Sequence, residues 1–236
     1  MIRFLPLFNG AQVILQLNDR KFSVSKEILC RASPSFLKGL NSGFKEGLSQ
    51  IVTLEEMKGV ITERSLEALI QWIYTARIKF NTEDVKSPTR HISAILEFVR
   101  LADMRAMTGM ESQMARAIED IVRCNLARLE FSASDISLNT HFIATEHILS
   151  AELLPTAHPV RRVLAQASVD GYLRSRETFK FGPQLQTCPK FAADLLEEVG
   201  QALDKTRFIR GRFCFQDPMT KDWVIFNDRK GNKIEE

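Results

Sequence analysis

The side chains best suited to metal or acid–base chemistry are four histidines, and their spacing does not form a ligand set. His141 and His147 are six positions apart, so they do not align on one face of a helix. The chain has no His-Glu-x-x-His sequence, which would place two histidines one helical turn apart. We therefore predict no metal site, and assign surface or helix-capping roles to His91, His141, His147 and His158.

Three glycines are the closest approach to a phosphate-binding loop. Gly39, Gly43 and Gly47 are evenly spaced, but such a loop needs a Gly-Lys step followed by Ser or Thr, directly after a strand. Here Gly43 is followed by Phe44, and a helical pattern precedes it. We interpret these glycines as positions where a helix end and the following loop approach each other closely.

Nucleophile and paired-carboxylate patterns are also missing. The chain has no Gly-x-Ser-x-Gly sequence of the kind that exposes a catalytic serine. Glu55-Glu56 and Glu197-Glu198 are adjacent carboxylates, and neighbours on a helix point away from each other. They therefore cannot flank one substrate bond, and we predict that both pairs are solvated. The sequence predicts no enzyme and no cofactor.

One cluster mixes basic and aromatic residues near the carboxyl terminus. Arg207, Arg210 and Arg212 alternate with Phe208 and Phe213. Such a cluster can neutralise and stack on a nucleic acid strand, or it can be the exposed face of a β-strand. We favour the exposed strand, because 32 basic and 29 acidic side chains leave a net charge of only +3.

Composition limits the class of protein. A chain of 236 residues, 44% hydrophobic and 26% charged, is long enough for one large or two small globular domains. The apolar run at the amino terminus is interrupted by Pro6, so we expect neither a secretory signal nor a membrane span. Sparse cysteines favour reduced thiols over a disulfide framework, so we expect a cytoplasmic or nuclear protein; they are Cys30, Cys124, Cys188 and Cys214.

Residues 12–80 contain the strongest secondary-structure pattern. Val13, Leu15 and Leu17 alternate as in a half-buried strand, and a turn at Asn18-Asp19 leads into a return strand at 22–24. Residues 51–54 predict a third, short strand.

Two helix starts are marked by capping residues. Ser33-Pro34 combines a capping side chain with a proline suited to the first turn. Thr62 is placed to cap a second helix, with Ile61 before it packing on Leu66 as a hydrophobic staple. Its apolar stripe consists of Leu66, Leu69, Ile70 and Ile73.

This order of hairpin, short helices, third strand and longer helix resembles the BTB/POZ domain. The resemblance rests on Val13-x-Leu15, Phe22, Leu29, Ser33-Pro34-Ser35-Phe36, Phe44-Lys45-Glu46, Leu54 and Ile73-Tyr74-Thr75. Gln12 and Ser25-Lys26 depart from the family pattern. The resemblance implies an α+β domain in which a small three-stranded sheet is flanked by about five helices.

The resemblance also implies two interaction surfaces. One is a homodimer interface at the apolar amino-terminal segment and the first helix, comprising Phe4, Leu5, Leu7, Phe8, Ser25, Ile28 and Leu29. The other is the cullin-binding surface of ubiquitin-ligase adaptors, in which a hydrophobic-x-Glu element precedes the third helix; Ile61 and Glu63 have that form. Both residues also have a local explanation, because Ile61 suits the staple and Glu63 the helix amino terminus.

Helical patterns continue after residue 80. Ser87-Pro88 and the capping box Thr108-x-x-Glu111 predict two helices that would complete the domain, and we place its end at residue 124. The serine-rich residues 132–137 predict a linker.

Residues 125–236 predict a mainly helical extension. Helices are expected over 145–153, from His158-Pro159, and from Pro189, the last with Phe191, Leu195, Val199 and Leu203 on one face; a β-hairpin is expected over 213–226 with its turn at Asp217-Pro218. The extension resembles one that follows the BTB domain in fungal proteins, through Glu146-His147-Ile148, Leu154-Pro155 and His158-Pro159-Val160-Arg161.

Together these patterns predict a protein-interaction module that assembles through a BTB domain, by homodimerisation and recruitment of a protein partner or scaffold. Two alternatives stay open: a substrate adaptor of a cullin-dependent ubiquitin ligase, and a nucleic-acid-associated transcriptional regulator that uses the arginine cluster.

Overall fold

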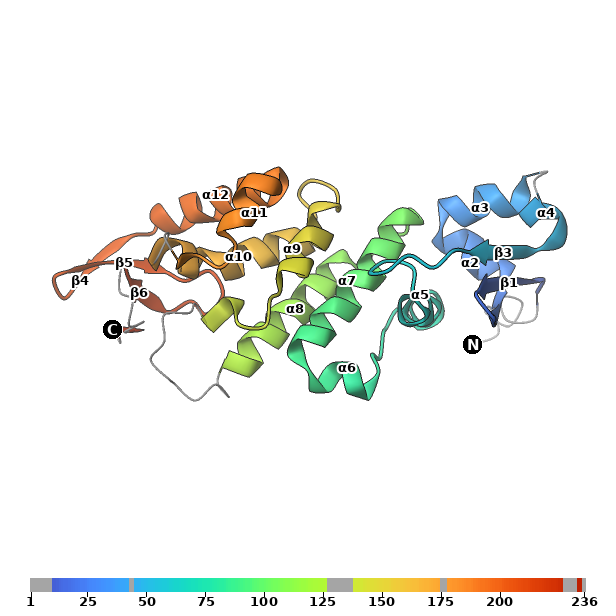
Figure 1. Cartoon of the computed structure of the whole chain (residues 1–236), viewed down its shortest axis with the longest axis horizontal. Coiled ribbons are helices and arrows are strands. Elements are labelled where there is room, and N and C mark those ends of the chain that lie inside the picture. The colour runs from blue at the N-terminus through green and yellow to red at the C-terminus, as the bar shows by residue number, and fades with distance from the viewer. Residues whose placement is uncertain (1–9, 43–44, 127–137, 175–177, 227–232, 235–236) are drawn as a thin grey trace. The chain divides into compact units, whose positions relative to one another are not determined.

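The computed structural model describes residues 10–42, 45–126, 138–174, 178–226 and 233–234 (Figure 1). The fold class is α+β, and the chain divides into two compact units. The amino-terminal unit consists of residues 1–84 and 93–110, and the carboxy-terminal unit of residues 85–92 and 111–236.

A three-stranded mixed sheet begins the amino-terminal unit. Strands β1 (Gln12–Leu17) and β2 (Arg20–Ser25) form an antiparallel hairpin, with Asn18 at a φ of 51° in its turn. Strand β3 (Ile51–Leu54) pairs with β1 in parallel, so the strand order is β2-β1-β3. The predicted alternation is confirmed, since every second residue of β1, beginning with Val13, is buried.

Short helices connect and follow these strands. They are α2 (Lys26–Ala32), α3 (Pro34–Asn41), α4 (Lys45–Ser49), α5 (Glu63–Thr75), α6 (Thr82–Lys86) and α7 (Pro88–Met104). The close approach predicted at the glycines is confirmed at Gly47, where a Cβ atom would lie 2.0 Å from the carbonyl oxygen of Ser42. No side chain fits at that distance, so the approach of Ser42 to α4 requires glycine at position 47. A Cβ atom on Gly39 would meet open space, so the prediction fails there, and Gly43 lies outside the described residues.

Two helix starts have the predicted caps. The Ser33 hydroxyl accepts a hydrogen bond from the backbone N–H of Phe36 (3.2 Å), and Pro34 occupies the first turn of α3. Before α5, the Thr62 hydroxyl accepts from the Ser65 N–H (3.2 Å), and the Ser65 hydroxyl accepts from the Thr62 N–H (3.0 Å). Ile61 and Leu66, the two residues of the predicted staple, are both buried.

The carboxy-terminal unit is built around one buried helix. Its helices are α8 (Glu111–Leu126), the 3₁₀ turn η2 (Leu138–Thr140), α9 (Thr145–Glu152), α10 (Pro159–Arg174), α11 (Gly182–Thr187) and α12 (Pro189–Leu203). Helix α10 packs against α8, α9 and α12. Most of its residues from Val160 to Asp170 are buried, as expected for a helix enclosed by others.

A small antiparallel sheet ends the chain. Its strands β4 (Arg207–Ile209), β5 (Arg212–Gln216), β6 (Trp223–Ile225) and β7 (Lys233–Ile234) pair in sequence order. The predicted hairpin is confirmed as β5 and β6, and β4 and β7 extend it. At its turn the Asp217 carboxylate accepts from the backbone N–H groups of Met219 (2.7 Å) and Thr220 (3.4 Å).

One helix start was predicted wrongly. Helix α8 begins at Glu111, whereas the capping box placed Thr108 directly before the helix. The intervening Gly109 has a φ of 100°, a left-handed conformation that does not continue into a helix. The linker predicted over 132–137 lies outside the described residues.

Candidate interaction surfaces

The predicted dimer residues of the first helix form part of the interior of their own unit. Ser25 and Leu29 are completely buried, and Ile28 is 9% exposed. The Ser25 hydroxyl accepts from the Ile28 N–H (3.5 Å), and the Ser25 N–H donates to the Tyr74 hydroxyl (2.8 Å). These residues therefore position α2, whose exposed face includes Glu27 and Arg31.

The dimer interface itself stays a prediction. Its four amino-terminal members, Phe4, Leu5, Leu7 and Phe8, lie outside the described residues.

The two residues of the hydrophobic-x-Glu element have different environments. Ile61 is 5% exposed and belongs to the core of the unit. The Glu63 side chain is 44% exposed and forms an ion pair with Arg20 of β2. Glu63 is thus accessible to a partner, whereas Ile61 supports the start of α5 from inside.

A surface groove with about 290 Å³ of open space lies beside the accessible Glu63. Glu67 and Gln71 of α5 line it, together with Lys79 and Asp84. Acidic and basic side chains both line this groove, so it suits a partner that carries charges of both signs.

Arg64 connects the groove wall to the neighbouring helix. Its guanidinium bonds Asp84 (Nη1 to Oδ1, 2.6 Å) and Glu97 of α7 (Nη2 to Oε1, 2.7 Å). Burial by itself lowers the pKa of Arg64, but the hydrogen bonds and charges of Glu97 and Asp84 raise it overall. The Thr62 hydroxyl also donates to Glu97 (2.9 Å), so this cluster ties the capped end of α5 to α7.

The basic–aromatic cluster forms an exposed hairpin, β4–β5. Phe208 and Phe213 are directly opposite in the sheet, 65% and 64% exposed, with ring centroids 5.0 Å apart. Arg210 and Gly211 form the turn, at φ values of 48° and 80°. The predicted exposure is confirmed, although Arg210 lies in the turn and not on a strand.

The three arginines are not equivalent. The Arg207 guanidinium lies 4.8 Å from the centre of the Trp223 ring on β6, a cation–π contact. Arg210 and Arg212 are exposed and form no ion pair in the part of the chain that the structure describes. All three side chains are exposed, but only Arg207 rests on an aromatic ring.

A comparison with known protein families matches residues 8–115 to the BTB/POZ domain. Residues 8–115 form a BTB/POZ domain. This range contains β1 to β3, helices α2 to α7 and the first residues of α8. The BTB domain is a non-catalytic protein–protein interaction module, in agreement with the interaction module predicted from the sequence.

Two further searches gave negative results. A search of curated proteins found no significant match to the chain. Among the described residues, no helix has both the length and the apolar character needed to cross a bilayer.

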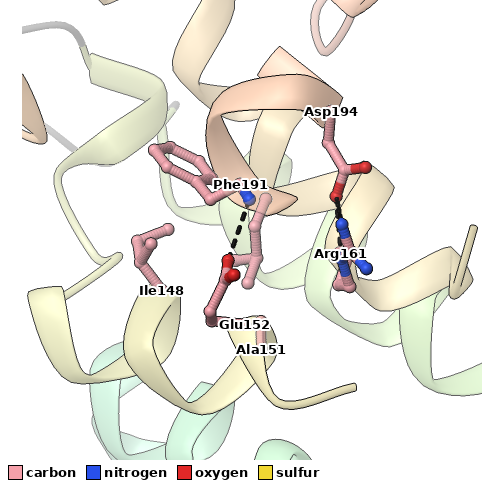
Figure 2. Close-up of a pocket in the computed structure, with 7 residues that line it drawn as sticks. Ile148, Ala151, Glu152, Arg161, Phe191 and Asp194 are labelled. Atoms are coloured by element: carbon pink, nitrogen blue, oxygen red, sulfur yellow. Dashed lines mark hydrogen bonds and ion pairs between the residues drawn. The ribbon is translucent and has the colours of Figure 1, made fainter. Parts of the chain in front are cut away.

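Outside the BTB domain, the interior of the carboxy-terminal unit contains a small cavity beside an ion pair (Figure 2). Arg161 bonds Asp194 (Nη2 to Oδ2, 2.8 Å), and the Glu152 carboxylate accepts from the N–H groups of Lys190 (3.0 Å) and Phe191 (2.9 Å) at the start of α12. The free space is about 10 Å³, roughly what one water molecule needs. These polar groups join helices, and the cavity is too small for a ligand.

The prediction that both adjacent glutamate pairs are solvated is wrong for Glu198. Glu198, expected to be solvated, is 4% exposed and accepts hydrogen bonds from Arg162 (Nε to Oε1, 2.6 Å) and Gln166 (3.0 Å). It lies on the inner face of α12 with Leu195 and Val199. Its neighbour Glu197 is exposed, and so are Glu55 and Glu56, as predicted.

Two histidines have capping roles and not ligand roles. His147 Nδ1 accepts from the backbone N–H of Ala144 (3.0 Å), and His158 Nδ1 accepts from that of Val160 (3.2 Å). Burial lowers the pKa of His147 to about 4. Within the described residues no cluster of His, Cys, Asp and Glu side chains is arranged to hold a metal ion.

Helix α12 has an exposed apolar stripe that was not predicted from the sequence. Ala193, Leu196, Gly200 and Leu203 recur three or four positions apart and are all exposed. Leu203 was assigned to the buried face, which the helix instead completes with Ala202. The sequence does contain this second set of apolar positions, offset from the buried set of the same helix. The pattern by itself does not show whether such a set is buried or exposed.

Proposed function

We propose that the protein is an assembly factor whose BTB domain brings two copies together and whose carboxy-terminal unit recruits a protein partner. The observation that supports this most directly is the BTB/POZ domain over residues 8–115.

Homodimerisation is the first part of the proposal. Strands β2 and β3 are the two edges of the described sheet, and an edge strand has unpaired backbone groups that a strand from another chain can cover. The apolar residues at positions 4, 5, 7 and 8 would supply such a strand, with Pro6 confined to its outer edge.

Light scattering on the intact chain and on a chain without residues 1–9 tests this part. We expect at least a dimer mass for the intact chain and a lower mass for the shortened one at the same concentration. A monomer for the intact chain at every workable concentration contradicts dimerisation. A dimer that persists after the deletion contradicts only the contribution of the segment, and points to another contact, on the exposed face of α2 or outside the BTB domain.

A cullin-dependent adaptor role is the second candidate, and the accessible Glu63 beside its groove favours it. We expect Glu63→Lys to abolish binding to an immobilised panel of purified cullins, with Glu55→Lys as a matched control at an exposed site. Equal binding by both variants, or none by the parent protein, excludes this role.

The extent of the domain is also a proposal. We place its end near residue 124 and assign residues 125–236 to an extension of the fungal type, on the motifs around His147 and His158. Because α8 packs against α10, a fragment of residues 1–124 loses that cover. We expect it to fold nonetheless, with a cooperative melting curve; an insoluble or molten fragment contradicts the boundary.

A nucleic-acid-associated role is the weakest of the three. It depends on the arginines of the β4–β5 hairpin, and binding would weaken strongly with added salt. Its test is combined with that of the proposal below.

A further inference from the structure

The exposed stripe of α12 has alternating small and large side chains. Leu196 and Leu203 are 58% and 44% exposed, and they flank Gly200. A Cβ atom built on Gly200 would have no heavy atom within 4 Å, so open space lies above that position. The two leucines and the glycine therefore form a shallow notch, lined by apolar atoms, on the outer face of the helix.

Acidic side chains border this notch on one side. Glu197 and Asp204 each follow one of the two leucines in sequence, and both are exposed. Neither forms an ion pair with a side chain in the described ranges. The outer face of α12 is consequently apolar along its centre and negative along one border.

The hairpin that follows α12 has the complementary character. Phe208 and Phe213 meet at an interplanar angle of 64°, so the two rings form one compact apolar projection. Arg210 and Arg212 lie beside it with accessible charges. In Figure 1 the β4–β5 turn projects from the sheet of its unit. An aromatic projection flanked by arginines has a composition that is enriched in protein interfaces.

We propose that the β4–β5 hairpin of one copy docks on the outer face of α12 of a second copy, and that the contact is reciprocal. The aromatic pair fills the notch at Gly200, and Arg210 and Arg212 face Glu197 and Asp204. The two copies are related by a two-fold axis, so the contact occurs twice: the hairpin of each copy docks on α12 of the other. This contact lies outside the BTB domain and does not depend on the function proposed above.

A nucleic acid strand fits the hairpin less well. Stacking of bases needs open aromatic faces, and here the two rings pack edge to face against each other. A phosphate backbone along the hairpin would also approach Glu197 and Asp204 on the helix that leads into it. Charge therefore favours a second copy of this chain as the occupant.

Reciprocal charge reversal tests the proposal on the full chain. One variant combines Arg210→Glu with Arg212→Glu, and the other combines Glu197→Arg with Asp204→Arg. Each should weaken the contact between its own copies at least about tenfold, since each reversal replaces attraction by repulsion. A mixture of the two variants should recover to within about twofold of the parent, because both contacts of the mixed pair are again complementary.

The readout is photo-crosslinking, which does not require the BTB domain to be monomeric. Phe213 is replaced by p-benzoylphenylalanine, and copies with light and heavy nitrogen are mixed, so that links between copies are distinguished by mass. We expect links from residue 213 of one copy to residues 191–205 of the other. Links only within a copy, or to another region of the second copy, overturn the proposal.

A matched control separates specific pairing from total charge. Arg90→Glu with Arg116→Glu makes the same change in net charge at two exposed positions of the same unit, and should leave the inter-copy links unchanged. Failure of the mixed variants to recover overturns the proposal, as does equal loss in the control. Binding of a fluorescent single-stranded oligonucleotide that is lost with Arg210→Glu and Arg212→Glu, in place of copy-to-copy links, would instead assign the hairpin to nucleic acid.

Discussion

The two units bury different kinds of polar group. Among the described residues of the amino-terminal unit, the buried polar ones are Ser25, Ser33 and Ser65, and each forms a hydrogen bond with a backbone atom within five positions of it. The buried polar residues of the carboxy-terminal unit also include charged ones: Arg161, Asp170, Glu198 and Asp217. The amino-terminal unit thus satisfies its buried polar groups largely through local caps, whereas the carboxy-terminal unit also buries charged side chains.

Three of these charged groups have side-chain partners that are far away in sequence, whereas Asp170 pairs with Arg174 one helical turn along. Arg161 and Asp194 are 33 positions apart, Arg162 and Glu198 are 36 apart, and Asn139 and Asp217 are 78 apart. Breaking a buried ion pair leaves the remaining charge without compensation, whereas losing a cap exposes one backbone group. The carboxy-terminal unit should therefore be the more sensitive of the two to loss of polar groups.

The largest effect should come from a charge placed in the apolar core of the BTB domain. Leu69 of α5 is completely buried, so Leu69→Asp forces a carboxylate into an environment without a partner. This costs several kcal/mol, against a total stability of about 5–15 kcal/mol for a typical domain. We expect loss of the melting transition of this unit by circular dichroism.

The matched control for Leu69→Asp is Glu67→Asp, on the exposed face of the same helix. It should leave the melting curve nearly unchanged. An unchanged curve for Leu69→Asp would show that the stripe of α5 does not form the core.

The next largest effect should come from the ion pair in Figure 2. Arg161→Met removes the partner of Asp194 and a donor to the Pro155 carbonyl (3.0 Å), and should destabilise the protein by about 3–5 kcal/mol. The double change Arg161→Met with Asp194→Leu should recover most of this loss, because no buried charge remains. Urea unfolding measures both.

The exposed pair Arg123–Glu119 provides the comparison. Arg123→Met should cost no more than about 0.5 kcal/mol, as is usual for surface pairs one helical turn apart. A double variant as unstable as Arg161→Met alone would mean that the lost packing of the side chain, and not its charge, causes the effect.

A third effect depends on pH and again concerns the carboxy-terminal unit. The pKa of His147 is lowered by burial from 6.5 to about 4, so below pH 6.5 the unfolded chain binds a proton that the folded one does not. Stability should therefore fall between about pH 6.5 and pH 4, by about 3 kcal/mol in total.

His147→Gln isolates this contribution, because glutamine is an acceptor that stays neutral. Subtraction of the two curves is needed, since Asp217 acts in the opposite direction. Burial, followed by the charge of Asp170, raises its pKa from 3.8 to about 6, so its contribution to stability is lost as the pH rises through that value. Parallel curves for the parent and His147→Gln would contradict the assignment.

The smallest effect should come from a cap in the BTB domain. Ser33→Ala removes the acceptor for the Phe36 N–H and the donor to the Arg105 carbonyl (2.5 Å), and should cost about 1 kcal/mol. Ser35→Ala, at the second position of the same helix, should cost less than half as much. Equal losses in a thermal melt would show that the cap at Ser33 is not formed.

Local patterns in the sequence were sufficient for the three strands of the BTB domain and for the starts of α3 and α5. Alternation at Val13, Leu15 and Leu17, the serine–proline start at Ser33 and the cap at Thr62 all involve residues within a few positions of one another. Such patterns act through contacts inside one strand or one helical turn, so they are visible without a partner element. The order of these elements then resembled the domain as a whole.

Tertiary structure alone decided which elements pair and which charges are buried. The parallel pairing of β1 with β3 and the burial of Glu198 have no local signal. Glu197 and Glu198 look equivalent in sequence, yet only Glu198 faces Arg162 on α10. The difference between the two carboxylates arises from the rotation of α12 against α10, because residues one position apart on a helix point in directions about 100° apart.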